Sequence, residues 1–343
     1  MWITVIVACA AAITLAVIFR PVAKSPTAEE PEPTGDRDAV ASVAVGQLKG
    51  RPVVVTGGWD GTVGVWDLAT RRPVGKPMTG HTSVVWSVTV AQVDGRSIAV
   101  TLSEDGTMRV WDLATRQSMG KPMVGHTGTT AAVGQLKGRP VVVTGGWDGT
   151  VRVWDLTTHR PVGKPITGDT VASVRAVAIT QVKGRPVVIT GGLKETVRVW
   201  DLTTRRPVGK PMTGHTNSVE AVALGRVSGQ RVIVTGGSDD SVRVWDLTTH
   251  DLLGQLAGHA DAVYAVVVAQ VDGRPIAVTG DLDGTVRVWD LTTRRPVGKP
   301  MTGHTDAVKT VAVAQVDGRP VAVTVDHDNM MRVWDLPAIP RQR

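Results

Sequence analysis

The sequence predicts an all-β protein built from seven copies of one antiparallel unit. The dipeptide Trp-Asp recurs at intervals of 43 to 46 residues, beginning at Trp66, Trp111, Trp154, Trp200, Trp245, Trp289 and Trp334. Each copy holds short alternating or Val-rich runs typical of strands, and Asp-Gly and Gly-Arg-Pro segments between them favour tight turns. A period of this length indicates a stacked or radial array. Such an array explains how 343 residues can form one folded unit.

Each unit is expected to contain three clear strands and a weaker fourth. The first alternates between apolar and polar residues, as in 307–313, and the second is Val-rich, as in 52–56. The third leads into the Trp-Asp dipeptide, as in 150–154. A fourth strand around residues 72–78 contains two prolines, which confine it to a sheet edge because proline cannot donate a ladder hydrogen bond.

The first forty residues differ in composition from the repeats. Residues 2–19 carry no charge and would span about 27 Å as a helix, close to the thickness of a hydrocarbon core. We therefore predict a transmembrane anchor over residues 1–20. A signal peptide, cleaved or retained, is the main alternative, although no basic leader precedes the run, and a lipoprotein box ending at Cys9 is another. Residues 21–34 are rich in Pro and Glu and predict a linker, so the folded domain is 35–343.

The repeated unit resembles the WD-repeat family. Gly-His precedes most first strands, Trp-Asp closes each third strand, and a Thr lies ten residues before the Trp in all seven copies. The resemblance covers about residues 35–336 and implies a seven-bladed β-propeller of four-stranded blades, in which radial repetition leaves only short sheet edges.

The resemblance also implies a hydrogen-bonded set of His, Thr, Asp and Trp in each blade. Blade 2 supplies His81, Thr101, Asp105 and Trp111, and blade 6 is expected to supply His259, Thr279, Asp283 and Trp289. The corresponding histidines of blades 3, 5 and 7 are His126, His215 and His304. These five histidines are therefore expected to be buried structural partners, and not catalytic groups.

Two blades depart from this set. Blade 4 has Asp169 in place of the His and Lys194 in place of the Asp, which predicts a carboxylate–ammonium bridge. Blade 1 has Asp36 opposite Asp60, and two carboxylates cannot make the usual bond. A bound cation and an exposed closure are the two alternatives there.

The sequence contains no convergent set of acid, base and nucleophile, so we predict that the protein is not an enzyme. The three remaining histidines, His159, His250 and His327, lie on turns of different blades, and no metal-binding or nucleophile motif accompanies them. Cys9 is the single cysteine, which excludes an internal disulfide framework and a zinc site built from cysteines. We expect no cofactor and no metal.

The net charge of +7 is concentrated on one predicted face, here called the bottom face, which carries the first-to-second and third-to-fourth strand turns. Three alternatives remain for this basic surface: a solvated and partly paired surface, an anionic lipid site, or a nucleic-acid site. The last would require interleaved aromatic residues, which this predicted face lacks. The basic residues are Lys49, Arg51, Arg71, Arg72, Arg96, Arg116, Lys137, Arg139, Arg160, Lys183, Arg185, Arg205, Arg206, Arg226, Arg231, Arg274, Arg294, Arg295 and Arg319.

Four aromatic residues that belong neither to the predicted anchor nor to the seven Trp-Asp dipeptides are expected on the opposite, top face. In the resembled family, their positions ring the mouth of the central channel and commonly contact partners. The predicted ring consists of Trp59, Trp86, Trp147, Tyr264, Arg175, Glu220, Lys309, Glu104 and His327. Its content of Trp, Tyr and Arg is typical of interface hot spots. We predict that it binds a protein or peptide; the alternative is that the aromatic residues only fill the channel mouth.

The predicted anchor sets a predicted orientation. Arg20 and Lys24 follow the apolar run and no Lys or Arg precedes it, which favours a cytoplasmic propeller on the positive-inside rule. We expect the propeller itself to be monomeric. Pro337 and Pro340 are unsuited to a seventh outer strand, so residues 24–34 are expected to close the ring.

The abundance of Ala, Val, Gly and Arg is typical of a GC-rich bacterial genome.

Overall fold

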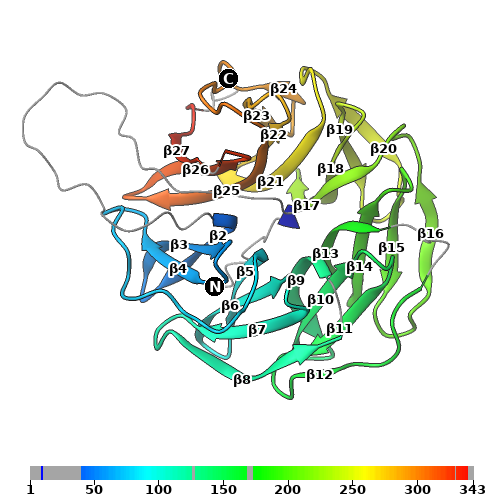
Figure 1. Ribbon diagram of the computed structural model, residues 1–343. Coiled ribbons are helices and arrows are strands. Elements are labelled where there is room, and N and C mark those ends of the chain that lie inside the picture. The colour runs from blue at the N-terminus through cyan, green and yellow to red at the C-terminus, as the bar shows by residue number, and fades with distance from the viewer. Residues whose placement is uncertain (1–8, 11–39, 126–127, 168–172, 329, 339–343) are drawn as a thin grey trace, which may run out of the picture.

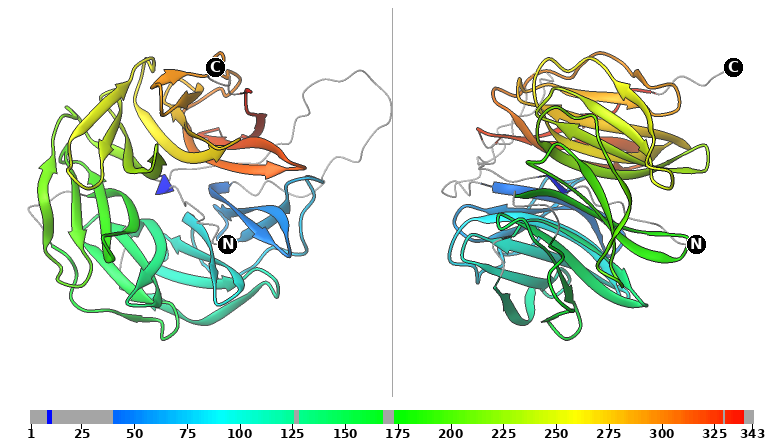
Figure 2. Two further views of the ribbon diagram at one scale, coloured as in Figure 1. Left: turned by 180° about the vertical axis from the view of Figure 1, so that it is seen from behind. Right: turned by 90° about the vertical axis from the view of Figure 1, so that its right-hand side faces the viewer.

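The computed structural model describes residues 9–10, 40–125, 128–167, 173–328 and 330–338. These residues form seven antiparallel sheets arranged as a ring around a central channel (Figure 1). Figure 2 shows the same ring from behind and from the side. The prediction of an all-β, seven-bladed propeller is confirmed.

Each blade is built from consecutive strands, with the first strand at the channel and the last at the periphery. The strands of blades 1 to 3 are β2 (Val40–Leu48), β3 (Arg51–Gly58) and β4 (Val63–Asp67); β5 (Val85–Val93), β6 (Arg96–Ser103), β7 (Thr107–Asp112) and β8 (Gln117–Val124); and β9 (Gly128–Leu136), β10 (Arg139–Gly146), β11 (Val151–Asp155) and β12 (Arg160–Pro161).

Blades 4 to 7 follow the same order. Their strands are β13 (Val174–Val182), β14 (Arg185–Gly192), β15 (Val197–Asp201) and β16 (Pro207–Met212); β17 (Val219–Val227), β18 (Gln230–Gly237), β19 (Val242–Asp246) and β20 (Leu252–Leu256); β21 (Val263–Val271), β22 (Arg274–Asp281), β23 (Val286–Asp290) and β24 (Arg295–Pro296); and β25 (Val308–Val316), β26 (Arg319–Asp326) and β27 (Met331–Asp335).

The fourth strand lies at the outer edge of its sheet, as its prolines predict. In blade 1 it is reduced to two bridges, Val63 with Met78 and Trp66 with Pro73. In blades 2 and 4 it is continuous, as β8 and β16. Blade 7 has three strands among the described residues, and the predicted closing segment 24–34 lies outside them.

The hydrophobic core lies between the blades and not within them. Side chains of adjacent blades form shared clusters, such as Ile189 of blade 4 with Ile233 and Trp245 of blade 5. The second strands are buried on both faces. Their sequences are therefore continuous runs of Val, without the alternation of apolar and polar residues found in a half-exposed strand. Val54 of blade 1 packs in one cluster with Val323 of blade 7, so apolar contact closes the ring.

The N-terminal segment was predicted to be an apolar helix over 2–19, and the structure differs at the two residues it describes. Cys9–Ala10 forms a short strand, β1, antiparallel to β17, with Cys9 opposite Val222 and Ala10 opposite Ala221. It lies in the central channel (Figure 1), where the inner edge of β17 offers unpaired backbone groups to an extended chain. No helix among the described residues is long and apolar enough to cross a membrane.

A contact on the bottom face links each of blades 2 to 6 to the blade before it, and we call it the clasp. In these five blades the turn after Trp-Asp ends in a residue with positive φ, whose side chain reaches the fourth strand of the preceding blade. Arg116, Arg205 and Arg294 donate to the carbonyls of Val74, Val162 and Leu253. His159 and His250 instead donate from Nδ1 to the carbonyls of Lys121 and Lys210, at 3.2 and 3.0 Å.

The clasp requires glycine in the fourth strand of the preceding blade. Gly120 has a φ of 67°, and a Cβ there would lie 2.4 Å from the imidazole of His159. Gly138 has a φ of 77° and nothing within 4 Å of the same added atom. Substitutions at Gly120 and Gly138 therefore distinguish the cost of backbone strain, which both share, from the cost of losing the clasp contact, which applies only at Gly120.

We expect Gly138→Ala to lower the free energy of unfolding by about 1 kcal/mol through left-handed strain alone. Gly120→Ala should lower it by a further ~1–2 kcal/mol, because the methyl group displaces His159 from its carbonyl. Urea unfolding followed by tryptophan fluorescence measures both values. Equal losses for the two variants would show that the clasp contributes nothing to stability.

Candidate functional site

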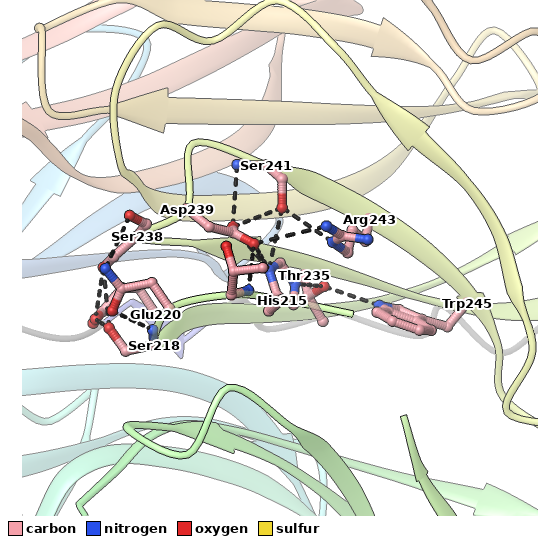
Figure 3. A network of polar contacts seen from close by, with 11 residues as sticks. His215, Ser218, Glu220, Thr235, Ser238, Asp239, Ser241, Arg243 and Trp245 are labelled. Carbon is pink, nitrogen blue, oxygen red and sulfur yellow. Dashed lines mark hydrogen bonds and ion pairs between the residues drawn. The ribbon is translucent and has the colours of Figure 1, made fainter. Parts of the chain in front are cut away.

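The predicted hydrogen-bonded set is present and fixes the top loops. In blade 5, Trp245 Nε1 donates to Thr235 Oγ1 at 3.0 Å, and His215 Nε2 lies 2.7 Å from the same oxygen (Figure 3). His215 Nδ1 lies 2.9 Å from Asp239 Oδ1. Because a carboxylate only accepts, Nδ1 carries the proton and Nε2 accepts the Thr hydroxyl. Asp239 also accepts the backbone N–H of Thr216, so the chain connects the sheet to the loop above it.

The Trp-to-Thr bond recurs in all seven blades, at distances of 2.7 to 3.2 Å. The four described histidines of the set, His81, His215, His259 and His304, each contact their Thr and an Asp, as predicted. His126, Asp36 and Asp169 lie outside the described residues, so the Asp169–Lys194 bridge and the alternatives at Asp36 stay predictions.

The predicted partner in blade 6 was wrong. His259 Nδ1 contacts Asp281 at 2.5 Å, not Asp283. Asp281 lies at the end of β22, where most blades have Gly or Ser, and its side chain is fully buried beneath the turn. A carboxylate there is closer to the imidazole than one in the turn. Blade 7 uses Asp326 in the same way.

Burial sets the protonation of these groups. Desolvation lowers the pKa of His81 and His215 despite their Asp partners, so both imidazoles are neutral in the fold. Burial opposes ionisation of Asp105, but hydrogen bonds from Thr107, Thr82 and His81 outweigh it and lower its pKa to about 2. The contact with Asp281 raises the pKa of Asp283.

A β-bulge near the top of each innermost strand places one extra residue at the channel mouth. The ladder skips this residue in every blade, for example between Val85 and Ser87 around Trp86. Bulges re-aim a side chain and are common beside functional sites. The seven bulge residues are Ala41, Trp86, Thr129, Arg175, Glu220, Tyr264 and Lys309.

A second set of variable residues lies on the turn between the second and third strands, three positions after the Thr. These residues are Trp59, Glu104, Trp147, Leu193, Ser238, Leu282 and His327. Together with the bulge residues they form what we call the top rim. Every predicted site residue belongs to it. The prediction missed Ala41, Thr129, Leu193, Ser238 and Leu282, although their fixed offset from the Thr could have identified the turn positions.

The rim residues of neighbouring blades contact each other. The rings of Trp59 and Trp86 meet edge to face, with centroids 5.7 Å apart. The Arg175 guanidinium lies 5.2 Å from the ring centroid of Trp147, and its Nη1 is 3.7 Å from Glu220 Oε2. Aromatic side chains and one partly buried ion pair thus cross three blade boundaries on the same face.

Glu220 is the most buried acid of the rim, with 3% of its surface exposed. Its Oε1 accepts the hydroxyls of Ser218 and Ser238 (Figure 3). Its Oε2 has no hydrogen-bond partner among the described residues. Burial and the nearby Glu220 raise the pKa of Tyr264, which therefore stays a neutral phenol.

The structure brings the remaining predicted rim residues to the same face but not into one cluster. Burial lowers the pKa of Lys309 to about 7, and its ammonium is close enough to His327 to help lower that imidazole's pKa. Glu104 is exposed and accepts the hydroxyl of Ser83 at 2.8 Å. Among the described residues, no group of three or more His, Cys, Asp or Glu could hold a metal ion.

The basic bottom face is partly paired, as one alternative predicted. Arg51, Arg139 and Arg274 lie 3.4 to 4.0 Å from the Trp-Asp aspartates of their own blades. Each of those aspartates also accepts two backbone N–H groups of the following turn, as Asp67 does from Ala69 and Thr70. Part of this charge is therefore paired within the fold.

Comparison with protein families agrees with this geometry. The model described as WD domain, G-beta repeat matches residues 32–67, 72–112, 120–155, 206–246, 250–290 and 295–335. The chain belongs to the WD40 family. The matches leave out most of blade 4, where Asp169 and Lys194 replace the usual His and Asp of this WD40 protein. The search of curated proteins found no match.

We expect Thr235→Val to destabilise this WD40 protein strongly. The change keeps the shape of the side chain but leaves Trp245 Nε1 and His215 Nε2 buried without a partner, at roughly 1–3 kcal/mol for each group. Thr248→Val, on an exposed turn of the same blade, should change stability by less than about 0.5 kcal/mol. Denaturant unfolding compares the two, and similar values would contradict a stabilising role for the set.

The stability of the fold should fall on acidification. The unfolded histidines titrate near pH 6.5, whereas burial keeps His81 and His215 neutral to lower pH, so the unfolded state takes up protons first. Below about pH 4, the loss of stabilisation from Asp105 adds to this as pH falls toward 2. Urea unfolding at pH 8 and 5.5 tests the first part, and His81→Gln should show a smaller difference. Stability that rises on acidification would contradict the burial argument.

Proposed function

We propose that this WD40 protein is a non-enzymatic scaffold that binds a protein or peptide through the top rim. WD40 propellers are typically protein-interaction scaffolds, and six family matches support this class of function. The observation that carries the choice of face is the exposed indole of Trp147. It remains 56% exposed while one neighbour, Arg175, packs near its ring. Exposed Trp beside Arg is the composition of interface hot spots.

The charge of the top face supports a partner with basic residues. Every turn between the second and third strands carries at least one carboxylate, as in Asp60, Asp148 and Glu195. Leu193 and Leu282 add exposed apolar area on the same turns, at 45% and 39%. A segment that combines apolar anchors with Lys or Arg would satisfy both features.

The membrane tether is a separate proposal. It rests on the uncharged run 2–19, of which the structure describes only Cys9 and Ala10. A cytoplasmic propeller, a bacterial source, a monomeric state and the absence of enzymatic activity likewise stay predictions. Binding of anionic lipid by the bottom face remains the second candidate, supported by Arg72, Arg96 and Arg160, which form no ion pair with a described residue.

Trp147→Ala and the double variant Trp59→Ala/Trp86→Ala test the top rim. Partners captured by the full-length protein are identified first, and their affinity for each purified variant is then measured. We expect each variant to weaken binding by at least ~2 kcal/mol, as loss of buried aromatic anchors does, with little change in melting temperature. Leu252→Ala, an equally exposed apolar residue on the outer strand β20, is the control.

Two results would contradict the top-rim proposal. Unchanged affinity in both rim variants would show that the partner binds elsewhere. A melting temperature lowered by several degrees would show that the tryptophans are packing residues and not contact residues.

A further inference from the structure

A groove on the bottom face lies between blades 2 and 3. It has a volume of about 720 Å³ and is bounded by the turn after β5, the strand β8 and the turn after β11. Its floor is apolar and includes Ile98, Met119 and Leu156. A volume of this size fits a short segment of an extended ligand.

The groove lies at a clasp that differs from those made by arginine. Arg116, Arg205 and Arg294 extend to the carbonyl of the residue before the fourth-strand glycine. His159 has a shorter side chain and contacts the carbonyl of Lys121, the residue after that glycine. The seam between blades 2 and 3 is therefore not filled by a guanidinium.

The floor also differs from the other repeats. Met119 occupies a position that is Val in blades 1, 3, 4 and 6, and Leu in blade 5. It is half-buried and lines the groove. Met is flexible and polarisable, and it is frequent at surfaces that adapt to a ligand.

The rim of the groove is cationic. Arg96, Lys121 and Arg160 line it and are exposed, and none forms an ion pair with a described residue. In three other blades, the arginine equivalent to Arg96 does pair with the Trp-Asp aspartate. Asp94 is the single carboxylate of the lining. The charge balance thus favours an anionic occupant.

We propose that this groove binds an acidic peptide segment of a partner protein, with an aliphatic side chain on the apolar floor and flanking carboxylates against the cationic rim. The cations come from three strands around the floor, since Arg96 begins β6, Lys121 lies in β8 and Arg160 begins β12, so carboxylates on both sides of one aliphatic residue can meet them together. This site lies on the face opposite the top rim and does not depend on its function.

The probe is a fluorescein-labelled peptide of sequence Asp-Glu-Leu-Glu-Asp, titrated with the full-length protein and followed by anisotropy. We expect Lys121→Glu/Arg160→Glu to weaken binding at least tenfold. Lys164→Glu/Arg206→Glu makes the same charge change at the equivalent positions of the next seam, where Arg205 forms the clasp, and should leave the affinity within about twofold. Replacing the peptide Leu by Gly should also weaken binding at least tenfold.

His159→Arg provides a variant that leaves Arg96, Lys121 and Arg160 in place. It introduces the clasp side chain of blades 2, 4 and 6, so the variant should fold normally and lose peptide binding because the guanidinium occupies the groove. Circular dichroism and thermal melting establish folding. Trp147→Ala should bind the peptide as the unmodified protein does, which separates this site from the top rim.

Several outcomes would overturn the proposal. Absence of binding at millimolar peptide would do so, as would equal losses in the two charge-reversal variants, which indicate non-specific attraction. Equal binding of the Leu and Gly peptides would show that the apolar floor is not used. Tighter binding of anionic phosphatidylserine vesicles, with the same sensitivity to Lys121→Glu/Arg160→Glu, would assign the surface to lipid instead.

Discussion

The packing of each sheet between two neighbours is the constraint on which the rest of the propeller depends. A blade of three or four short strands cannot bury both of its faces alone, and only a closed ring covers every face. The contact of Val54 in blade 1 with the cluster around Val323 completes that ring. Hydrophobic burial therefore fixes the position of all seven blades relative to the channel, and the polar contacts act within this frame.

Different polar contacts hold the loops of the top face and the turns of the bottom face. On the top, buried sets such as Trp245, Thr235, His215 and Asp239 hold the loops, so the rim residues above them are free to vary. On the bottom, the recurring Trp-Asp aspartates cap the turns, and the clasp residues connect neighbouring blades. Two clasps use His in place of Arg, and the seam beside one of them, at His159, also carries Met119 and holds a groove. Residues thus vary between repeats on both faces. On the top they change the exposed rim, and on the bottom they change the contacts between neighbouring blades.

The period of the repeat and the strand order were sufficient to predict an array of antiparallel units, because each rests on local pattern. The seven-bladed propeller, and the position of Trp59, Trp86 and Trp147 on one face of it, followed from the resemblance to the WD-repeat family. The wrong prediction of Asp283 as the partner of His259 has a local cause. Asp281 and Asp283 are both near the turn, and only the packed blade shows that Asp281 is the one buried beside the imidazole.

By itself, the sequence determined the number of blades, the strands of each blade and the residues that could differ between copies, since all of these recur at fixed spacing. Only the tertiary structure decided which of those residues meet. The contacts of Arg175 with Trp147 and Glu220, and the seam beside His159, each join segments from different blades. Such contacts depend on how neighbouring sheets are rotated and spaced, and no pattern within a single repeat contains that information.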